Sequence, residues 1–214
     1  MGRRDLPAQN QRVLVLAALT ALRQAACSAH LVDKSLPRTS AKLERLRELV
    51  AELREEGHQA LVFSQFVSLL GIVREMLAAD GVKLRYLDGS TPATVRQEEV
   101  DRFQQGDGDV FLISLKAGGT GLNLTAATYV IHLDPWWNPA VEDQASDRAH
   151  RIGQDRPVTV YKLVARGTVE EAIVALQGEK RALVDGVLGD AGKAASLPLD
   201  ELVALLSYGQ GSDA

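Results

Sequence analysis

Five short apolar runs, rich in valine, isoleucine and leucine, stand out along the chain. Runs of this length and composition, separated by glycine-containing and polar segments, are typical of buried β-strands. We therefore expect strands at Ala60–Ser64, Leu84–Leu87, Val110–Ser114, Tyr129–Leu133 and Val158–Leu163.

Between these runs, leucine, valine and alanine recur three or four residues apart, the spacing that gives a helix one apolar face. This spacing predicts helices over about residues 11–31, 41–57, 66–81, 92–105, 139–151, 169–188 and 197–206. Strands that alternate with helices form βαβ units, in which right-handed crossovers join parallel strands. The expected fold class is therefore α/β, with a parallel sheet flanked by helices and helical extensions at both ends. We expect a helical lead-in (1–36), an α/β lobe (37–190) and a linker with a short helix (191–214).

Hydroxyl residues mark two of the expected helix starts. Serine and threonine favour the N-cap position because their oxygens accept hydrogen bonds from free backbone N–H groups. Thr39 or Ser40 is expected to cap the second helix. Thr168 is expected to cap the long helix over residues 169–188.

Composition narrows the classes of protein to consider. At 214 residues the chain can bury a sizeable core, and one domain is the simplest count. The net charge of −4 gives no global electrostatic case for nucleic-acid binding, so any such contact must come from a local patch. The single cysteine, Cys27, fits a reducing cytoplasm, and no cluster with metal-ligand spacing is expected. The apolar run at 13–22 is far too short to span a bilayer, so we expect a packed helix.

The first candidate site residues lie on the helix expected to begin at Pro139. Proline is suited to the first position of a helix. Gln144, Arg148 and Arg151 lie at i, i+4 and i+7 and therefore share one face. Two guanidiniums together suit phosphate, which a planar fork of donors can bind. The alternative is a solvated basic helix edge. A neighbouring apolar stripe would pack on the sheet, and it consists of Ala145, Ala149 and Ile152.

Two loops at the ends of expected strands can also meet phosphate. In segment 88–92, Ser90 or Thr91 would cap a helix whose first position is Pro92, and a helix N-terminus offers free N–H groups to anions. The same residues would equally serve as an ordinary helix start. The second loop is the glycine-rich segment 116–121.

The stretch from residue 110 to residue 154 resembles motifs V and VI in the second RecA-like lobe of SNF2-type ATPases, the superfamily 2 DNA translocases that include chromatin remodellers. The matching residues are Ser114, Lys116-Ala117-Gly118-Gly119, Gly121-Leu122-Asn123-Leu124, Asp134, Trp136-Trp137-Asn138-Pro139, Gln144-Ala145 and Arg148-Ala149-His150-Arg151-Ile152-Gly153-Gln154. Ser64-Gln65-Phe66 resembles motif IV, and the resemblance covers nearly the whole chain. It implies a RecA-like sheet.

The resemblance implies a role in ATP hydrolysis for one group of residues. Arg148 and Arg151 would be the catalytic arginine fingers that reach the γ-phosphate, with Gly121, Asn123 and Gln144 near the nucleotide. The Walker signature GxxxxGK[ST] and an acidic Asp-Glu-x-His box are absent from the chain. In the family both lie on the first lobe. ATP and Mg²⁺ are therefore expected only at a composite site shared with an N-terminal RecA-like lobe, and the chain alone is expected to be inactive.

A second group would contact the backbone of double-stranded DNA. These DNA-binding candidates are Ser64, Ser90, Thr91, Lys116, Gly118 and Trp137. Lysine and backbone amides meet phosphate oxygens without reading the base sequence. Trp137 would wedge against a sugar or a base edge, whereas the alternative is that both tryptophans anchor loop packing. Trp136 stands where many eukaryotic members carry a polar residue, so the resemblance assigns it no role.

The expected function is that of a second motor lobe in an ATP-dependent double-stranded DNA translocase or remodeller. Its partners would be the N-terminal lobe, the DNA backbone and a protein target on the DNA, with no membrane. One alternative is a superfamily 2 ATPase associated with RNA or a polymerase, and another is a free-standing interaction module without catalysis. Trp137-Asn138-Pro139 favours the SNF2 type, and the intact Arg148 and Arg151 argue against lost catalysis. A bacterial member would be cytoplasmic and nucleoid-associated, a eukaryotic one nuclear.

Overall fold

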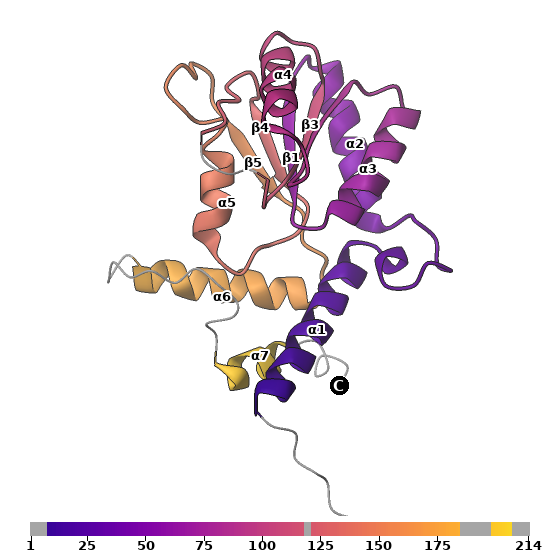
Figure 1. Ribbon diagram of the computed structural model, residues 1–214, viewed down its shortest axis with the longest axis vertical. Coiled ribbons are helices and arrows are strands. Elements are labelled where there is room, and N and C mark those ends of the chain that lie inside the picture. The colour runs from indigo at the N-terminus through magenta and orange to yellow at the C-terminus, as the bar shows by residue number, and fades with distance from the viewer. Residues whose placement is uncertain (1–7, 118–120, 185–197, 207–214) are drawn as a thin grey trace, which may run out of the picture.

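The computed structural model describes residues 8–117, 121–184 and 198–206 (Figure 1). Strands and helices alternate over most of this length, as the hydrophobic pattern predicts. The elements are α1 (Ala8–Cys27), a 3₁₀ helix η1 (Ala29–Leu31), α2 (Ala41–Glu55), β1 (Ala60–Ser64), α3 (Val67–Ala79), β2 (Leu84–Leu87), α4 (Ala93–Gln104), β3 (Val110–Ser114), β4 (Tyr129–His132), α5 (Pro139–Ser146), β5 (Thr159–Lys162), α6 (Val169–Val184) and α7 (Leu199–Leu206).

The five strands form one parallel sheet in the order β2-β3-β1-β4-β5. Strand β1 is central, so that Val62 stands beside Leu112 on one side and Ile131 on the other. Every residue of β1 and β3 is buried, as expected for strands that helices cover on both faces. The five predicted strands are confirmed. The bounds of β1, β2 and β3 are as expected, whereas β4 is one residue shorter at its end and β5 at both ends.

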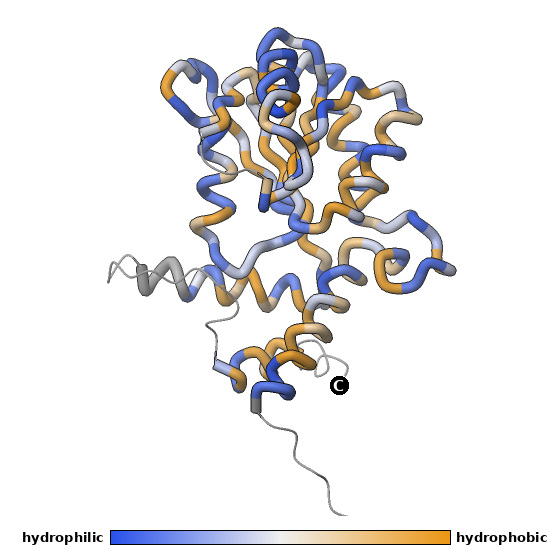
Figure 2. The backbone as a smooth tube through the Cα atoms, in the orientation of Figure 1, coloured by the Kyte–Doolittle hydropathy of each residue, from blue (hydrophilic) through white to orange (hydrophobic). Residues whose placement is uncertain are grey.

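Three apolar clusters hold the helices in place. On one face of the sheet, α2 contributes Leu46 and α3 contributes Val73 to the first cluster. On the other face, α4 contributes Phe103 and α5 contributes Ala145 to the second (Figure 1). The third cluster joins α1, α6 and α7 beyond the carboxyl ends of the strands, and its members include Leu19, Trp137, Val169, Ile173 and Leu202. Figure 2 shows apolar residues concentrated along the sheet and on the helix faces turned toward it.

The α/β, RecA-like fold class is therefore confirmed, and the helical extensions at both ends pack against each other through α1 and α7. The division of the chain at residues 36 and 190 stays a prediction.

Helix α2 ends as its sequence predicts. Gly57 has a φ of +75°, which glycine adopts without strain. This conformation lets the N–H groups of Gly57 and His58 bind the carbonyl oxygens of Arg54 and Leu53, at 3.1 and 2.8 Å. Helices α3 and α4 end with the same pair of bonds. All three helices thus close at the amino edge of the sheet and leave the carboxyl edge to loops.

Several helix bounds differ from the expected ranges. Helix α1 ends at Cys27, and a separate 3₁₀ turn follows it. Neither Ser90 nor Thr91 caps α4, whose N-cap residue is Pro92. The reason is that the Thr91 hydroxyl accepts a bond from the N–H of Asp88 instead, 3.0 Å away.

The start of α6 is confirmed, and two other helix bounds lie outside the described residues. Thr168 caps α6, since its hydroxyl accepts from the N–H of Glu170 at 3.2 Å. The predicted end of α6 near residue 188 and the predicted start of α7 at residue 197 lie outside the described residues.

Ser40 rather than Thr39 caps α2. Its Oγ accepts a hydrogen bond from the N–H of Leu43 at 3.3 Å and donates one to the carbonyl of Cys27 at 2.6 Å. The same hydroxyl therefore starts α2 and ties it to the end of α1.

Replacing Ser40 by alanine is expected to lower the free energy of unfolding by about 1–2 kcal/mol, because the cap and the link to Cys27 are both lost. Urea denaturation measures this change. Thr39→Ala is the matched control, since Thr39 is exposed and does not cap. Equal losses in the two variants would show that the cap is not the cause.

Candidate functional site at the carboxyl edge of the sheet

The candidate site residues gather at one edge because all strands run in the same direction. Segment 88–92 follows β2, segment 115–124 follows β3, and segment 133–138 follows β4 (Figure 1). Ligands of open α/β sheets bind at this carboxyl edge. The predicted nucleotide-binding and DNA-binding residues all come from these loops, from the end of β1, or from α5 and the turns after it.

The two arginines do not share a helix face as predicted. Helix α5 ends at Ser146, so Arg148 and Arg151 lie in turns beyond it, and Gln144 is exposed on α5 itself. The helix stops because the carbonyl of Arg148 accepts the N–H of Leu124, at 2.9 Å. This long-range bond joins the turn to the loop after β3.

The predicted apolar stripe beside these arginines is correct only in part. Ala145 and Ala149 are buried in the second cluster, whereas Ile152 is fully exposed.

Arg148 is held under the surface with its charge intact. Only 4 % of the residue is exposed, and its guanidinium lies over the ring of Phe63, 5.3 Å from the centroid. Burial, together with the positive charges of Arg151 and Arg96, lowers the pKa of Arg148 to about 10. The side chain therefore stays protonated at neutral pH in a region where positive charges converge.

Arg151 is exposed beside a shallow depression of about 650 Å³. The depression is lined by Asn123, His150, Arg151, Ile152 and Gln154. Gln154 fixes its floor, because its side-chain amide donates to the carbonyls of Thr125, Ala127 and Ala149 at 2.9–3.1 Å. The structure thus brings Arg151 together with Asn123, as expected for residues of one site. Gly121 lies nearby in sequence and is exposed, with a φ of +104°.

The DNA-binding candidates fall into two groups. Lys116 is exposed, Ser90 is exposed and Thr91 is half-buried, so all three can be reached from solvent. In the turn after β2, the hydroxyl and N–H of Ser90 both donate to the carboxylate of Asp88, at 2.6 and 2.8 Å. These bonds hold the pKa of Asp88 below its usual value. Gly118 lies outside the described residues.

Ser64 cannot contact DNA in this arrangement, which corrects the prediction. It is completely buried, its hydroxyl donates to Asp134, and it accepts the N–H of Phe66 at 2.9 Å. Burial raises the pKa of Asp134 to about 6, and Arg23 opposes this shift. The end of β1 is closed because α1 lies over it.

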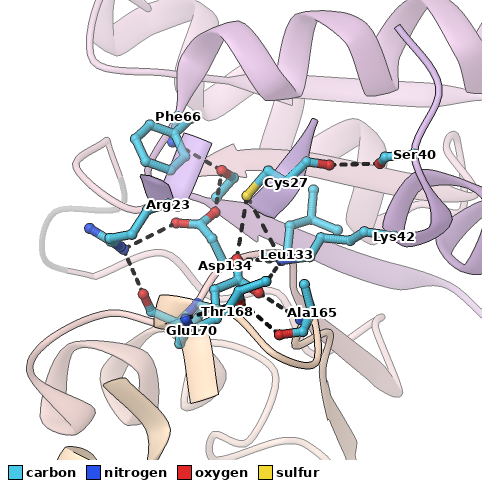
Figure 3. A network of polar contacts seen from close by, with 12 residues as sticks. Arg23, Cys27, Ser40, Lys42, Phe66, Leu133, Asp134, Ala165, Thr168 and Glu170 are labelled. Carbon is cyan, nitrogen blue, oxygen red and sulfur yellow. Dashed lines mark hydrogen bonds and ion pairs between the residues drawn. The ribbon is translucent and has the colours of Figure 1, made fainter. Parts of the chain in front are cut away.

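Arg23 of α1 provides this closure (Figure 3). It is 3 % exposed, donates to the carbonyl of Pro135 at 2.6 Å and lies 3.7 Å from the carboxylate of Asp134. Its guanidinium also lies over three aromatic rings, with centroid distances of 4.8 Å to Trp137, 5.5 Å to Trp136 and 5.6 Å to Phe66. Burial lowers the pKa of Arg23, and Asp134 opposes this change.

Lys42 forms the second half of this buried network. Its ammonium group binds both carboxylate oxygens of Glu170, at 2.5 and 2.6 Å, and the carbonyl of Leu133 at 2.8 Å (Figure 3). Lys42 is therefore buried, although lysine side chains are mostly exposed in soluble proteins. The pairing joins α2 to α6 across more than a hundred residues of sequence, so no local pattern could signal it.

Trp137 also differs from its predicted role. It is 5 % exposed and belongs to the third cluster, where it packs with α1, α6 and α7. A side chain buried in this way is not available to wedge against DNA, so the packing alternative is correct in this arrangement.

Comparison with known proteins identifies the chain. A sequence profile for the helicase conserved C-terminal domain matches residues 41–153, more than half of the chain. The chain belongs to this family, and its lobe is of the SNF2 type. It is 38 % identical over 209 residues to the protein YwqA of Bacillus subtilis, covering 95 % of this chain and 23 % of that protein. It is 41 % identical over 168 residues to the DNA repair protein RAD5 of Cryptococcus neoformans, covering 77 % of this chain and 14 % of that one.

Solved structures agree with this assignment. The SWI2/SNF2 ATPase C-terminal domain of Sulfolobus solfataricus superimposes with a TM-score of 0.73 at 30 % identity, covering 94 % of this chain and 84 % of that one. A Sulfolobus solfataricus SWI2/SNF2 ATPase core in complex with double-stranded DNA gives 0.72 at 36 % identity, covering 83 % and 38 %. The SNF2-type lobe described here spans less than a quarter of the length of the curated relatives named above.

The SNF2-type lobe offers arginines rather than metal ligands. Within residues 8–117, 121–184 and 198–206, histidine, cysteine and acidic side chains form no group of three or more that could hold a metal ion. No helix in this part of the chain is long and apolar enough to cross a membrane. What the site can supply chemically is positive charge and N–H donors for phosphate oxygens.

Sequence reasoning missed two supports of the arginine pair. Arg96 lies in the first turns of α4, and its guanidinium donates to the carbonyl of Ala117. His132 at the end of β4 stacks on Phe63, with ring centroids 5.5 Å apart, and Phe63 in turn carries Arg148. Arg96 is the first arginine after segment 88–92, and this position could have indicated its role. No local sequence feature marks His132.

The buried His132 predicts a pH dependence of stability. It is 1 % exposed, and burial, Lys162 and Arg148 lower its pKa to about 4. The unfolded chain, with a histidine pKa near 6.5, therefore binds the extra proton first as pH falls. This histidine's contribution to stability is complete above pH ~6.5 and is lost toward pH ~4, at up to about 1.4 kcal/mol per pH unit.

Replacing His132 by glutamine should remove this contribution, so the variant loses less unfolding free energy than the unmodified protein between about pH 7 and about pH 5. Urea denaturation at the two pH values measures the difference. His150→Gln serves as the control because His150 is exposed. The interpretation is wrong if His132→Gln has the same pH dependence as the unmodified protein.

Trp137→Leu separates packing from DNA contact. The buried ring leaves a cavity, so the free energy of unfolding should fall by about 2–4 kcal/mol. At a temperature where the variant is folded, its affinity for a short labelled duplex should stay within about twofold of the original, because the ring is buried in the third cluster and cannot reach a DNA backbone. Weaker DNA binding without a loss of stability would instead support the wedge.

Proposed function

We propose that this chain is the second motor lobe of an ATP-dependent double-stranded DNA translocase or remodeller of the SNF2 type. The observation that carries the proposal is the convergence of Arg148 and Arg151 beside the loop after β3. That loop also presents Lys116 to solvent, so one short segment lies between candidate nucleotide contacts and candidate DNA contacts.

Arg151 would meet the γ-phosphate of ATP directly. It is exposed and lies next to Asn123 at the depression after α5. Arg148 would leave the ring of Phe63 and join it when the two lobes close. Without a bound nucleotide, the positive charges of Arg148 and Arg151 repel each other. A bound phosphate would relieve that repulsion, which is one reason for arginines to converge at an anion site.

ATP and Mg²⁺ would occupy a composite site shared with an N-terminal RecA-like lobe. Such a lobe would supply the phosphate-binding loop and the carboxylates that hold the metal, and this chain would supply the arginine fingers. Gly121 and Gln144 are further proposed neighbours of the nucleotide. When bound, the metal would neutralise the developing charge on the phosphates.

The DNA backbone would lie along Lys116 and the turn at 88–92. Lys116 would give affinity that does not depend on base sequence. Ser90 would have to give up its bond to Asp88 in order to donate to a phosphate, because a hydroxyl has only one proton. Cycles of lobe closure and opening would then advance the grip along the duplex.

Replacing Arg151 or Arg148 by glutamine should reduce DNA-stimulated ATP hydrolysis roughly 10³- to 10⁵-fold, because the charge on the transition state loses its partner. The assay uses the protein in which this lobe works with an N-terminal RecA-like lobe. Affinity for duplex DNA, measured in parallel, should not change. Hydrolysis at the original rate in Arg151→Gln would refute the finger assignment.

Lys116→Gln tests the DNA side. Affinity for a short labelled duplex should fall several-fold, and the slope of log affinity against log salt concentration should decrease by about one. The matched control is Lys83→Gln, because Lys83 is also exposed but precedes β2 at the opposite edge of the sheet. Equal effects of the two substitutions would exclude a specific backbone contact. Binding of a protein partner that survives loss of Arg151 and Lys116 alike, with no DNA binding, would favour the interaction module.

A further inference from the structure

Arg96 connects two loops that the proposed function uses for different ligands. It belongs to α4, and its N–H closes the first turn of that helix on the carbonyl of Pro92, at 2.9 Å. Its guanidinium reaches across to the loop after β3 and donates to the carbonyl of Ala117. One side chain therefore joins the turn after β2 to the segment that follows Lys116.

The turn after β2 is braced, so it would move together with the start of α4. The N–H of Thr91 bonds to the carbonyl of Asp88 at 3.2 Å, and the N–H of Asp88 bonds to the hydroxyl of Thr91 at 3.0 Å. Pro92 then leads directly into the helix. A displacement of this turn by a DNA phosphate would accordingly shift the backbone that carries Arg96.

The other end of the connection is also braced. The N–H of Ala117 bonds to the carbonyl of Ser114 at 3.0 Å, and Ala117 is 3 % exposed. Its carbonyl is the group that Arg96 holds. The loop is thus fixed from the end of β3 on one side and from α4 on the other.

Arg96 also acts on Arg148 through its charge. The two charged residues that lower the pKa of Arg148 are Arg151 and Arg96, so the guanidinium of Arg96 is close enough to influence the buried arginine. A shift of Arg96 would change both the position of the loop after β3 and the electrostatic potential at Arg148.

We propose that Arg96 is a positioning residue that couples the 88–92 turn to Arg148 and to the loop after β3, through the carbonyl of Ala117. Contact between the turn and a DNA phosphate would in this way set the geometry for ATP hydrolysis. This inference rests on the proposed function of the lobe and adds to it the link between its two ligand sites. Arg96 would act through Ala117 and Arg148 without touching the reacting atoms.

The first test measures hydrogen–deuterium exchange in this chain alone. Arg96→Ala should speed exchange of the peptide that contains the Ala117 amide by roughly tenfold, because the loop loses one of its two anchors. Arg102→Ala is the matched control, since Arg102 is an exposed arginine in the last turn of the same helix. Unchanged exchange in Arg96→Ala would overturn the inference.

The second test measures turnover in the protein with both lobes. Arg96→Ala should lower the DNA-stimulated kcat roughly 10- to 100-fold while KM for ATP and affinity for DNA stay within about twofold, because misplacement affects the reaction more than binding. Arg96→Lys, which keeps the charge and a donor, should restore most of the rate. Arg102→Ala should behave like the unmodified protein.

The outcomes separate this inference from the proposed function. DNA-stimulated hydrolysis at the original rate in Arg96→Ala would overturn the coupling role and leave the motor lobe intact. A kcat that falls together with thermal stability, with no rescue by lysine, would also overturn it, since that result describes a structural role. Absence of DNA-dependent hydrolysis in the unmodified protein would refute the proposed function and the coupling together.

Discussion

Two ion pairs, Arg23 with Asp134 and Lys42 with Glu170, are buried at the carboxyl edge of the sheet, and the arrangement of the helices there follows from their need for partners. A charge removed from water destabilises the fold unless an opposite charge and hydrogen bonds compensate it. Arg23, Lys42, Asp134 and Glu170 come from α1, α2, the end of β4 and α6. Each of these elements must therefore dock at the same place. Their meeting closes the edge beside β1 and β4, which is why Ser64 and Trp137 are structural residues.

The rest of the edge stays open, and it is there that positive charge gathers. This part consists of the loops after β2 and β3 and the turns after α5. Arg96, Arg148 and Arg151 approach one another in this part, and Lys116 is exposed next to them. A protein with a net charge of −4 thus concentrates cations at the one edge where parallel strands offer a ligand site. The closed half holds the helices together, and the open half carries the candidate site.

The elements of the fold could be predicted from the sequence because they depend on local patterns. Apolar runs of four to six residues determine the strands, and the bounds of β1, β2 and β3 follow from them. The errors arise where a distant group competes with a local rule. Helical spacing continues through Arg151, yet α5 ends at Ser146 because Leu124 takes a carbonyl from the following turn. Lys42 has the sequence context of a surface residue, but Glu170 lies opposite it in the folded chain.

The same distinction applies to the candidate site. The candidate residues that the family resemblance selected gather at one edge of the sheet, and Arg151, Asn123 and Lys116 are accessible there. It could not tell that Arg148 rests on Phe63 or that Ser64 is covered, because both facts depend on contacts between separate elements.

The hydroxyl of Ser90, already engaged with Asp88, has a consequence for reversibility. A DNA phosphate that accepts the hydrogen bond of this hydroxyl would replace the Asp88 carboxylate as its acceptor. The number of hydrogen bonds would therefore stay the same. Such an exchange has a small net free energy in either direction. A contact of this kind would suit a translocase, which must release the duplex as often as it binds it. Neither the bound nor the free arrangement would then be so stable that the cycle stops there.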